Sequence, residues 1–121
     1  MIGIIGAMQI EIDRILERVE APVKRVESGI EYVSGKLLEQ DAVVAKCGIG
    51  KVNAAACAQT MALLFKPELV LNTGVAGSLS SELGVGDIAV GTDVVQHDVD
   101  TTALGDPPGM VSTVNIVHFP L

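Results

Sequence analysis

Apolar and polar positions along the chain follow two alternating patterns. Continuous or loosely alternating apolar runs predict strands, and apolar residues three and four positions apart predict helices. The strands are predicted at residues 1–5, 29–35, 41–47, 68–74, 87–96 and 110–119. One helix is predicted from Gln9 to about Val19, and a second, alanine-rich helix from about Lys51 to Phe65. The runs at 1–5 and 68–74 are typical of strands buried on both faces.

This order of elements predicts the fold class. Strands that alternate with helices favour an α/β fold with a mainly parallel or mixed twisted sheet and flanking helices. A sheet of this kind needs both faces covered, but no helix follows the strand predicted at 110–119. We therefore expect residues 1–121 to form a single, incomplete α/β domain, apparently truncated and the first part of a longer one.

Composition narrows the class of protein. Eight Lys and Arg face fifteen Asp and Glu, for a net charge of −7, which argues against nucleic acid as a partner. The opening apolar run is too short to cross a membrane. Cys47 and Cys57 lie in apolar surroundings without metal-ligand spacing, so we expect reduced core residues in a cytoplasmic protein.

Three junctions between strands and loops are candidates for chemistry. Ligands of open α/β sheets bind at the carboxyl ends of the strands. Glycine-containing junctions follow three predicted strands, at residues 6–8, 48–50 and 72–77. Glycines allow the backbone to approach a ligand closely. We expect all three junctions at one edge of the sheet.

Glu11 lies among isoleucines in the first turn of the first helix, and two interpretations remain open. In one, its carboxylate stabilises the helix N-terminus and pairs with Arg14. In the other, it is a partly desolvated general base with a raised pKa.

Two further motifs are weak. The Gly48–Gly50 turn resembles a dinucleotide-binding loop, but Asn53 replaces its third glycine, and a tight turn for helix packing explains it equally well. One histidine and two aspartates at 97–100 are too few for a metal site, so we expect no metal there.

Five collinear motifs resemble one family. They are IGIIGAMQIEI, CGIGKVNAA, NTGVAGSL, GVGDIAV and QHDVDTTALG. Together they are similar to the 5′-methylthioadenosine/S-adenosylhomocysteine nucleosidases of the purine nucleoside phosphorylase superfamily. The resemblance implies a nucleoside phosphorylase-like fold and hydrolysis of the N-glycosidic bond of adenine thionucleosides in methionine salvage. It also implies that no metal or organic cofactor takes part.

The resemblance assigns roles to residues at the junctions. Glu11 matches the glutamate that deprotonates the attacking water. Ala7 and Met8 match the loop that packs on the ribose, and Ile49 matches a residue that lines the thioether pocket. The substrate loop of the family matches Val75, Ala76 and Gly77, although many members carry serine where Val75 stands.

The resemblance also implies a homodimer, in which Leu104 of the loop 97–105 reaches the partner's ligand. The family's leaving-group acid and ribose-binding segment have no counterpart in these 121 residues, so we expect the chain alone to be inactive. Two alternatives remain. One is a purine nucleoside phosphorylase, although the 72–78 loop has no cation to hold phosphate. The other is a non-catalytic truncated fragment that keeps the dimer surface.

Overall fold

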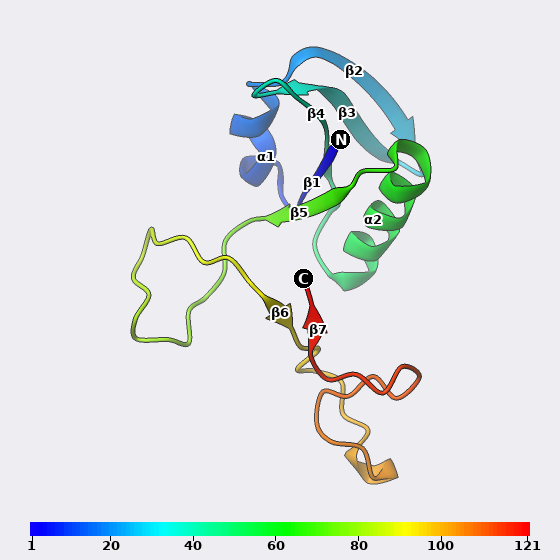
Figure 1. Ribbon diagram of the computed structural model, residues 1–121, viewed down its shortest axis with the longest axis vertical. Helices are drawn as coiled ribbons and strands as arrows, with labels where there is room; N and C mark the ends of the chain where they lie inside the picture. The colour runs from blue at the N-terminus through cyan, green and yellow to red at the C-terminus, as the bar shows by residue number, and fades with distance from the viewer. The chain divides into compact units, whose positions relative to one another are not determined.

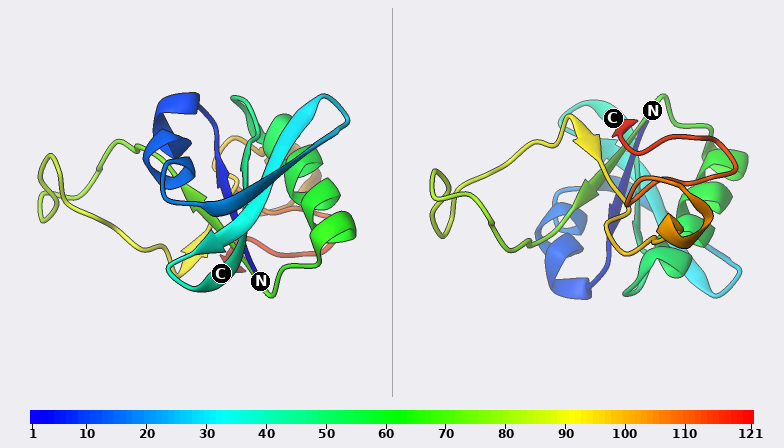
Figure 2. Two further views of the ribbon diagram at one scale, coloured as in Figure 1. Left: turned by 90° about the horizontal axis from the view of Figure 1, so that it is seen from above. Right: turned by 90° about the horizontal axis from the view of Figure 1, so that it is seen from below.

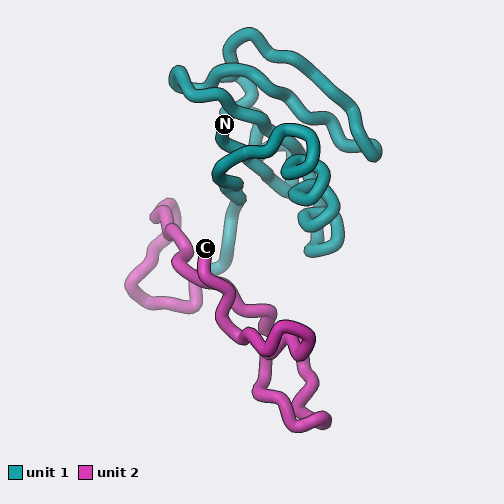
Figure 3. Tube along the Cα trace, turned by 45° about the vertical axis from the view of Figure 1, so that its right-hand side comes forward, with its two compact units in different colours: residues 1–77 teal, residues 78–121 magenta.

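The computed structural model describes residues 1–121, which form two compact units (Figure 3). The first unit comprises residues 1–77 and the second residues 78–121. The first unit contains β1 (Ile2–Gly6), α1 (Gln9–Leu16), β2 (Glu20–Glu27), β3 (Ile30–Leu37), β4 (Gln40–Lys46), α2 (Lys51–Phe65) and β5 (Leu69–Thr73). That both units belong to one domain stays a prediction.

A five-stranded mixed sheet organises the first unit, in the order β2-β3-β4-β1-β5 (Figure 1). β1 lies between β4 and β5 and is parallel to both, whereas β2, β3 and β4 are antiparallel neighbours. The expected α/β fold with a mixed sheet and flanking helices is confirmed. The parallel part of the sheet is the part that carries the three glycine-containing junctions.

Two tight hairpins join the antiparallel strands. Ser28 and Gly29 have φ angles of 51° and 77°, and Leu38 and Glu39 have φ angles of 50° and 67°. Two consecutive positive φ angles define the type I′ turn, whose twist matches that of paired strands. The second turn is therefore formed by Leu38 and Glu39.

β2 is an element that the sequence analysis missed. The first helix ends at Leu16 rather than near Val19, and the chain enters β2 at Glu20. β2 contains Pro22 and is exposed over nearly all its length. Proline is tolerated in a strand at the edge of a sheet, where its missing N–H leaves no ladder bond unmade.

The two helices cover opposite faces of the sheet (Figure 2). α1 packs through Ile12 on a cluster that includes Ile4 and Val44, and α2 packs through Cys57 and Met61 on the other face. The buried Tyr32 hydroxyl donates a hydrogen bond to the Cys57 carbonyl, 3.2 Å away. Burial raises the pKa of Tyr32 to about 12.

Both cysteines are buried and unbridged, as predicted. Burial raises the pKa of each thiol, Cys47 and Cys57, so both stay protonated at neutral pH. None of the helices combines the length and the apolar character that crossing a membrane requires.

The prediction that 68–74 is a buried strand is wrong in one respect. β5 forms, but Leu69, Val70 and Leu71 are 52, 40 and 46% exposed. The reason is its position, because β5 is an edge strand that pairs only with β1.

The second unit holds little regular structure. Its elements are β6 (Asp93–Val94), the 3-10 helix η1 (Thr102–Leu104) and β7 (Phe119–Pro120), with β6 and β7 antiparallel. The long strands predicted at 87–96 and 110–119 are therefore wrong in extent. Alternation alone does not make a strand, since the backbone also needs a partner along its whole length. Here the ladder pairs only two residues of the segment 87–96 and, within the segment 110–119, only Phe119.

Candidate functional site

Three strand ends come together at one edge of the sheet. The register places Gly6, the last residue of β1, beside Lys46 of β4 and beside Thr73 of β5. The segments that follow these strand ends therefore begin side by side at one edge of the sheet. They are residues 7–8, 47–50 and 74–77. This confirms the prediction that the three junctions share an edge.

Glu11 joins two of these junctions. The backbone N–H of Met8 donates to Oε2 of Glu11 at 2.9 Å, and the N–H of Val75 donates to Oε1 at 3.3 Å. The first bond is local, because a glutamate three residues into a helix reaches back to the amide that precedes it. The second spans the sheet edge, from the start of α1 to the end of β5. The carboxylate is thus oriented from two sides and remains only half-buried.

These contacts lower the pKa of Glu11. The N–H of Met8 is the largest cause. Desolvation is the second and opposes it by raising the pKa, and the amides of Val75 and Ala7 lower it further. The raised pKa of the general-base interpretation is therefore wrong, because donated hydrogen bonds outweigh desolvation. The proposed ion pair with Arg14 is wrong too, since Arg14 pairs with Glu17 at 3.2 Å.

Two glycines make room for this carboxylate and its helix. A Cβ on Gly74 would lie 2.7 Å from Oε1 of Glu11, and a Cβ on Gly6 would lie 2.5 Å from Cγ2 of Ile12. Neither distance is compatible with a side chain at its present place. Gly6 is thus required by close approach to Ile12, and Gly74 lets the Glu11 carboxylate keep its present position. The glycine at a strand end was the signal in the sequence.

The third junction is a turn held by Asn53. Gly48 and Gly50 have φ angles of 89° and 100°, in the region that favours glycine. The Asn53 amide nitrogen donates to the Ile49 carbonyl at 2.8 Å, and the Cys47 N–H donates to the Gly6 carbonyl at 2.9 Å. Asn53, at the position of the missing third glycine, therefore fixes a tight turn, a role that the sequence analysis did not assign to it.

The other predicted site residues fall into two groups. Ala7, Met8, Ile49, Val75, Ala76 and Gly77 follow the three strand ends that meet beside Glu11. Ile49 and Val75 are 74 and 84% exposed, so their apolar side chains stand open to solvent. Leu104 belongs to the second unit, where it is the last residue of η1 and is also exposed.

No group of three or more His, Cys, Asp or Glu side chains is arranged to hold a metal ion. In the loop where a metal was weighed, the Asp100 carboxylate accepts hydrogen bonds from the backbone and the hydroxyl of Thr102, at 3.0 and 2.7 Å. These bonds lower the pKa of Asp100.

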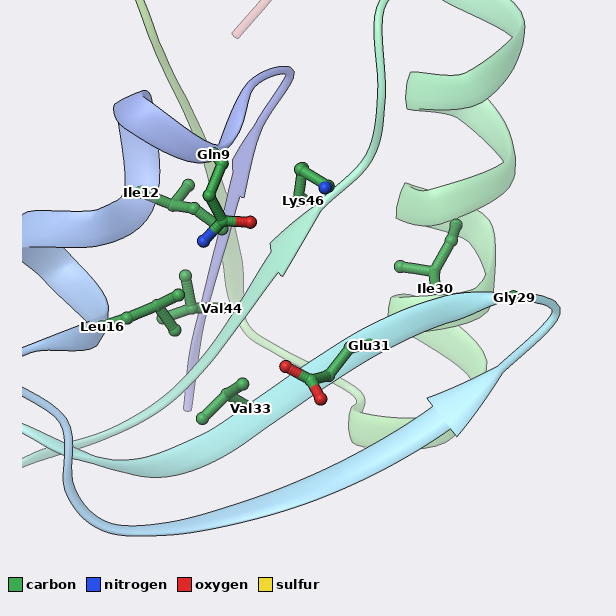
Figure 4. A pocket seen from close by; sticks show the side chains of 9 residues that line it. All are labelled: Gln9, Ile12, Leu16, Gly29, Ile30, Glu31, Val33, Val44 and Lys46. Atoms are coloured by element: carbon green, nitrogen blue, oxygen red, sulfur yellow. The ribbon is translucent and has the colours of Figure 1, made fainter.

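A shallow pocket of ≈ 220 Å³ lies elsewhere, between α1 and strands β3 and β4 (Figure 4). Its apolar floor includes Ile12, Val33 and Val44, and Glu31 at its rim pairs with Lys24 at 3.1 Å. No predicted site residue lines it. The predicted site residues therefore lie at the strand ends beside Glu11 and not in this pocket.

Comparison with known proteins shows which family this chain belongs to. The sequence pattern of the family described as "Phosphorylase superfamily" matches residues 1–120. The chain belongs to the phosphorylase superfamily. Its resemblance to the 5′-methylthioadenosine/S-adenosylhomocysteine nucleosidases is also confirmed, since one of these, from Shewanella halifaxensis, is 40% identical over 119 residues.

Two solved structures show the same likeness. A nucleosidase from Colwellia psychrerythraea in complex with adenine superposes with a TM-score of 0.94 at 37% identity, covering 98% of this chain and 49% of that one. A nucleosidase from Neisseria meningitidis in complex with methylthio-immucillin-A gives 0.93 at 37% identity, covering 98% and 51%. The match to the Shewanella halifaxensis relative covers 98% of this chain and 52% of that protein. The chain thus spans about half the length of the relatives it matches.

Proposed function

We propose that this chain supplies the water-activating part of an N-glycosyl hydrolase that cleaves 5′-methylthioadenosine and S-adenosylhomocysteine to adenine and the thioribose. The observation that carries the proposal is the Glu11 carboxylate, fixed by the amides of Met8 and Val75 at the edge where three strand ends meet. The relatives supply the reaction class, because those with solved complexes hold adenine or a methylthio nucleoside analogue.

Glu11 acts on the attacking water. Each carboxylate oxygen accepts one backbone N–H and keeps lone-pair capacity for a further donor. With its pKa lowered, the group is ionised at neutral pH and accepts a hydrogen bond from water without first losing a proton. Such a carboxylate is a weak base in the ground state. It becomes adequate as positive charge develops on the sugar in the oxocarbenium-like transition state.

The bond changes balance as follows. The water oxygen bonds to C1′ of the ribose, the bond from C1′ to the purine nitrogen breaks, and a water proton passes to Glu11. The departing adenine takes a proton from an acid that lies outside these 121 residues. The chain alone is therefore expected to be inactive.

The apolar residues beside Glu11 suit a thioether nucleoside. Met8, Ile49 and Val75 present exposed apolar side chains that can bury a methylthio or alkylthio group. Ala7, Ala76 and Gly77 are small and leave the backbone accessible to the ribose and purine. Val75 has no hydroxyl, so any polar contact to the sugar at this position comes from the backbone.

The assembly and its setting are part of the same proposal. The protein works as a homodimer in the cytoplasm, in methionine salvage, and Leu104 of one subunit closes the thioether end of its partner's pocket. Leu104 is 82% exposed on η1, so its side chain is accessible for such a contact.

Adenine release from methylthioadenosine tests the reaction. The chain is joined to the part of the Shewanella halifaxensis relative that lies outside the match, so that the missing residues are supplied. Glu11→Gln is expected to lower the rate by about 10²–10⁴-fold, the usual contribution of a general base. Glu17→Gln, at the exposed residue that directly follows the same helix, is the matched control and should retain activity.

Two results would contradict the proposal. One is equal activity of the Glu11→Gln and Glu17→Gln variants. The other is a rate that rises strongly with added phosphate and yields a sugar phosphate, which would make phosphate the nucleophile. Robust turnover by the 121-residue chain alone would show that the leaving-group acid has been misplaced.

A further inference from the structure

Asn53 and Glu11 occupy the same position in two helices. Glu11 is the third residue of α1, and Asn53 is the third residue of α2. Glu11 accepts the N–H of Met8, whereas Asn53 donates to the carbonyl of Ile49 at 2.8 Å. Each side chain thus reaches back from the start of a helix to the junction that precedes it. Glu11 also accepts the N–H of Val75, so these two side chains together contact all three junctions.

The turn before α2 combines backbone freedom with an exposed apolar side chain. Ile49 lies between Gly48 and Gly50, whose φ angles are 89° and 100°. Glycine has access to many backbone conformations, so fixing one conformation of this turn costs entropy. The Ile49 side chain is 74% exposed, so packing against the protein holds it only weakly. The direction in which this side chain points therefore depends on the hydrogen bonds of the turn.

Two hydrogen bonds restrain the peptide groups on both sides of Ile49. A peptide group is planar, so a bond to its carbonyl restricts the orientation of the whole group. The Cys47 thiol donates to the carbonyl of Gly48 at 3.1 Å and restrains the peptide group before Ile49. The Asn53 amide donates to the carbonyl of Ile49 and restrains the peptide group after it. Because a thiol is a weak donor, Asn53 supplies the stronger of these two restraints.

The Asn53 side chain also packs closely on the turn. A Cβ added to Gly48 would lie 3.3 Å from Nδ2 of Asn53 and 3.6 Å from its Cβ and Cγ. Residues 54–56, which follow in α2, are alanines, and alanine has a higher helix propensity than asparagine. Helix stability therefore does not account for an asparagine here, whereas its contacts with Gly48 and Ile49 do.

We propose that Asn53 is a positioning residue that sets the affinity of the site for the thioether group of its substrate. The inference rests on the proposed function, in which Ile49 lines the thioether end of the site. Asn53 acts through Ile49. The bond holds the turn in place before the ligand arrives, so the ligand does not have to order it. The affected ligands are adenine nucleosides with an alkylthio group, whereas adenine alone lacks the group that Ile49 contacts.

A split between KM and kcat tests this role in the chain joined to the remaining part of the Shewanella halifaxensis relative. Asn53→Asp keeps the size of the side chain and removes the donor, and an acidic residue suits the first turn of a helix. We expect KM for methylthioadenosine to rise by about three- to tenfold, the range of one neutral hydrogen bond, with kcat changed by less than about twofold. Inhibition by adenine should be unchanged.

Two further variants separate the hydrogen bond from general effects. Gln59→Glu is the matched control, because it makes the same exchange of amide for carboxylate at an exposed residue of α2, and it should leave KM unchanged. Asn53→Ser should restore most of the affinity, since a serine hydroxyl can donate to the carbonyl four residues before it. Calorimetry on the Glu11→Gln form of the joined protein gives the affinity for methylthioadenosine without turnover, and Asn53→Asp should weaken it by the same factor.

Backbone dynamics of the 121-residue chain test the turn without any ligand. Nitrogen-15 relaxation reports the order parameters of the Ile49 and Gly50 amides. We expect them to fall from about 0.85, the value of a rigid backbone, toward about 0.6 in Asn53→Asp. Gln59→Glu should leave them unchanged.

Three outcomes would overturn the proposal. They are an unchanged affinity for methylthioadenosine in Asn53→Asp, an equal loss in Gln59→Glu, and order parameters that do not fall. A loss of kcat at constant KM would also contradict it, because Asn53 would then act on the chemical step. Affinity and order parameters are measured without turnover, so this role and the proposed reaction can fail separately.

Discussion

β2 and β5 flank the same five-stranded sheet, yet their residues differ in kind. β2 presents Lys24, Arg25 and Glu27 to solvent, with ion pairs from Lys24 to Glu31 and from Arg25 to Glu27. β5 presents leucines and valine, and its C-terminal end continues into Val75, whose amide bonds to Glu11. On one side the sheet ends in a charged strand, whereas on the other it ends in an exposed apolar strand whose C-terminal end leads into the candidate site.

The difference between the two strands bears on where functional contacts are expected. A charged and irregular edge strand resists pairing with another chain. β5 has no such residues, and the segment that follows it helps to hold Glu11. One row of neighbouring residues crosses the sheet from β2 to β5, and substitutions along it test the difference between the two strands. The row consists of Lys24, Val33, Val44, Ile4 and Leu71.

The largest effect is expected at the centre of the row. Ile4→Ala removes a side chain that is 6% exposed and leaves a cavity under α1. We expect a loss of about 2–5 kcal/mol in the free energy of unfolding. Urea unfolding followed by circular dichroism measures it, and a loss no greater than at Leu71 would show that the row is not a core.

A smaller effect is expected at the β5 end. Leu71 is 46% exposed, so Leu71→Ala gives up only about half of the burial of a core leucine. We expect about 1 kcal/mol in the isolated chain. The same urea titration measures it. A loss as large as that of Ile4→Ala would show that Leu71 is packed like a core residue.

The smallest effect is expected at the β2 end. Lys24 makes an exposed ion pair with Glu31, with side chains 65 and 48% accessible. Lys24→Ala should therefore change the free energy of unfolding by no more than about 0.5 kcal/mol. Added salt should shrink even this difference. A loss as large as that at Leu71 would remove the distinction between the two edges.

The elements that could be predicted are those whose own residues are sufficient to specify their structure. The apolar run of β1 and the alanine-rich sequence of α2 specify their structure locally, and α2 has the predicted bounds, Lys51–Phe65. β2 could not be recognised from the sequence, because Pro22 and the charged residues of this segment are typical of a loop. Only its pairing with β3 makes the segment a strand. The segment 87–96 is the converse case, in which a strand-like pattern has a partner for only two residues.

The position of the candidate site could be predicted, whereas the direction of the pKa shift of Glu11 could not. Glycines at three strand ends and a glutamate in the next helical turn indicated the edge. The N–H of Met8 reaches Glu11 through a local contact, whereas the sequence could not show that the N–H of Val75 also points at Glu11, because backbone direction in a loop depends on the whole fold. The sign of the pKa shift follows from those two groups, so desolvation alone predicted the wrong direction.

The most direct test of the account is a pH titration of the Glu11 carboxyl carbon and of the Met8 and Val75 amides by nuclear magnetic resonance. The pKa of Glu11 is lowered from 4.5, so the hydrogen-bonded carboxylate persists below that pH and is lost as the pH falls through the lowered pKa. The account predicts that all three signals shift together with a midpoint below 4.5, and that Glu11→Gln abolishes the shift of both amides. A midpoint at or above 4.5, or a Val75 amide that does not follow Glu11, would contradict it.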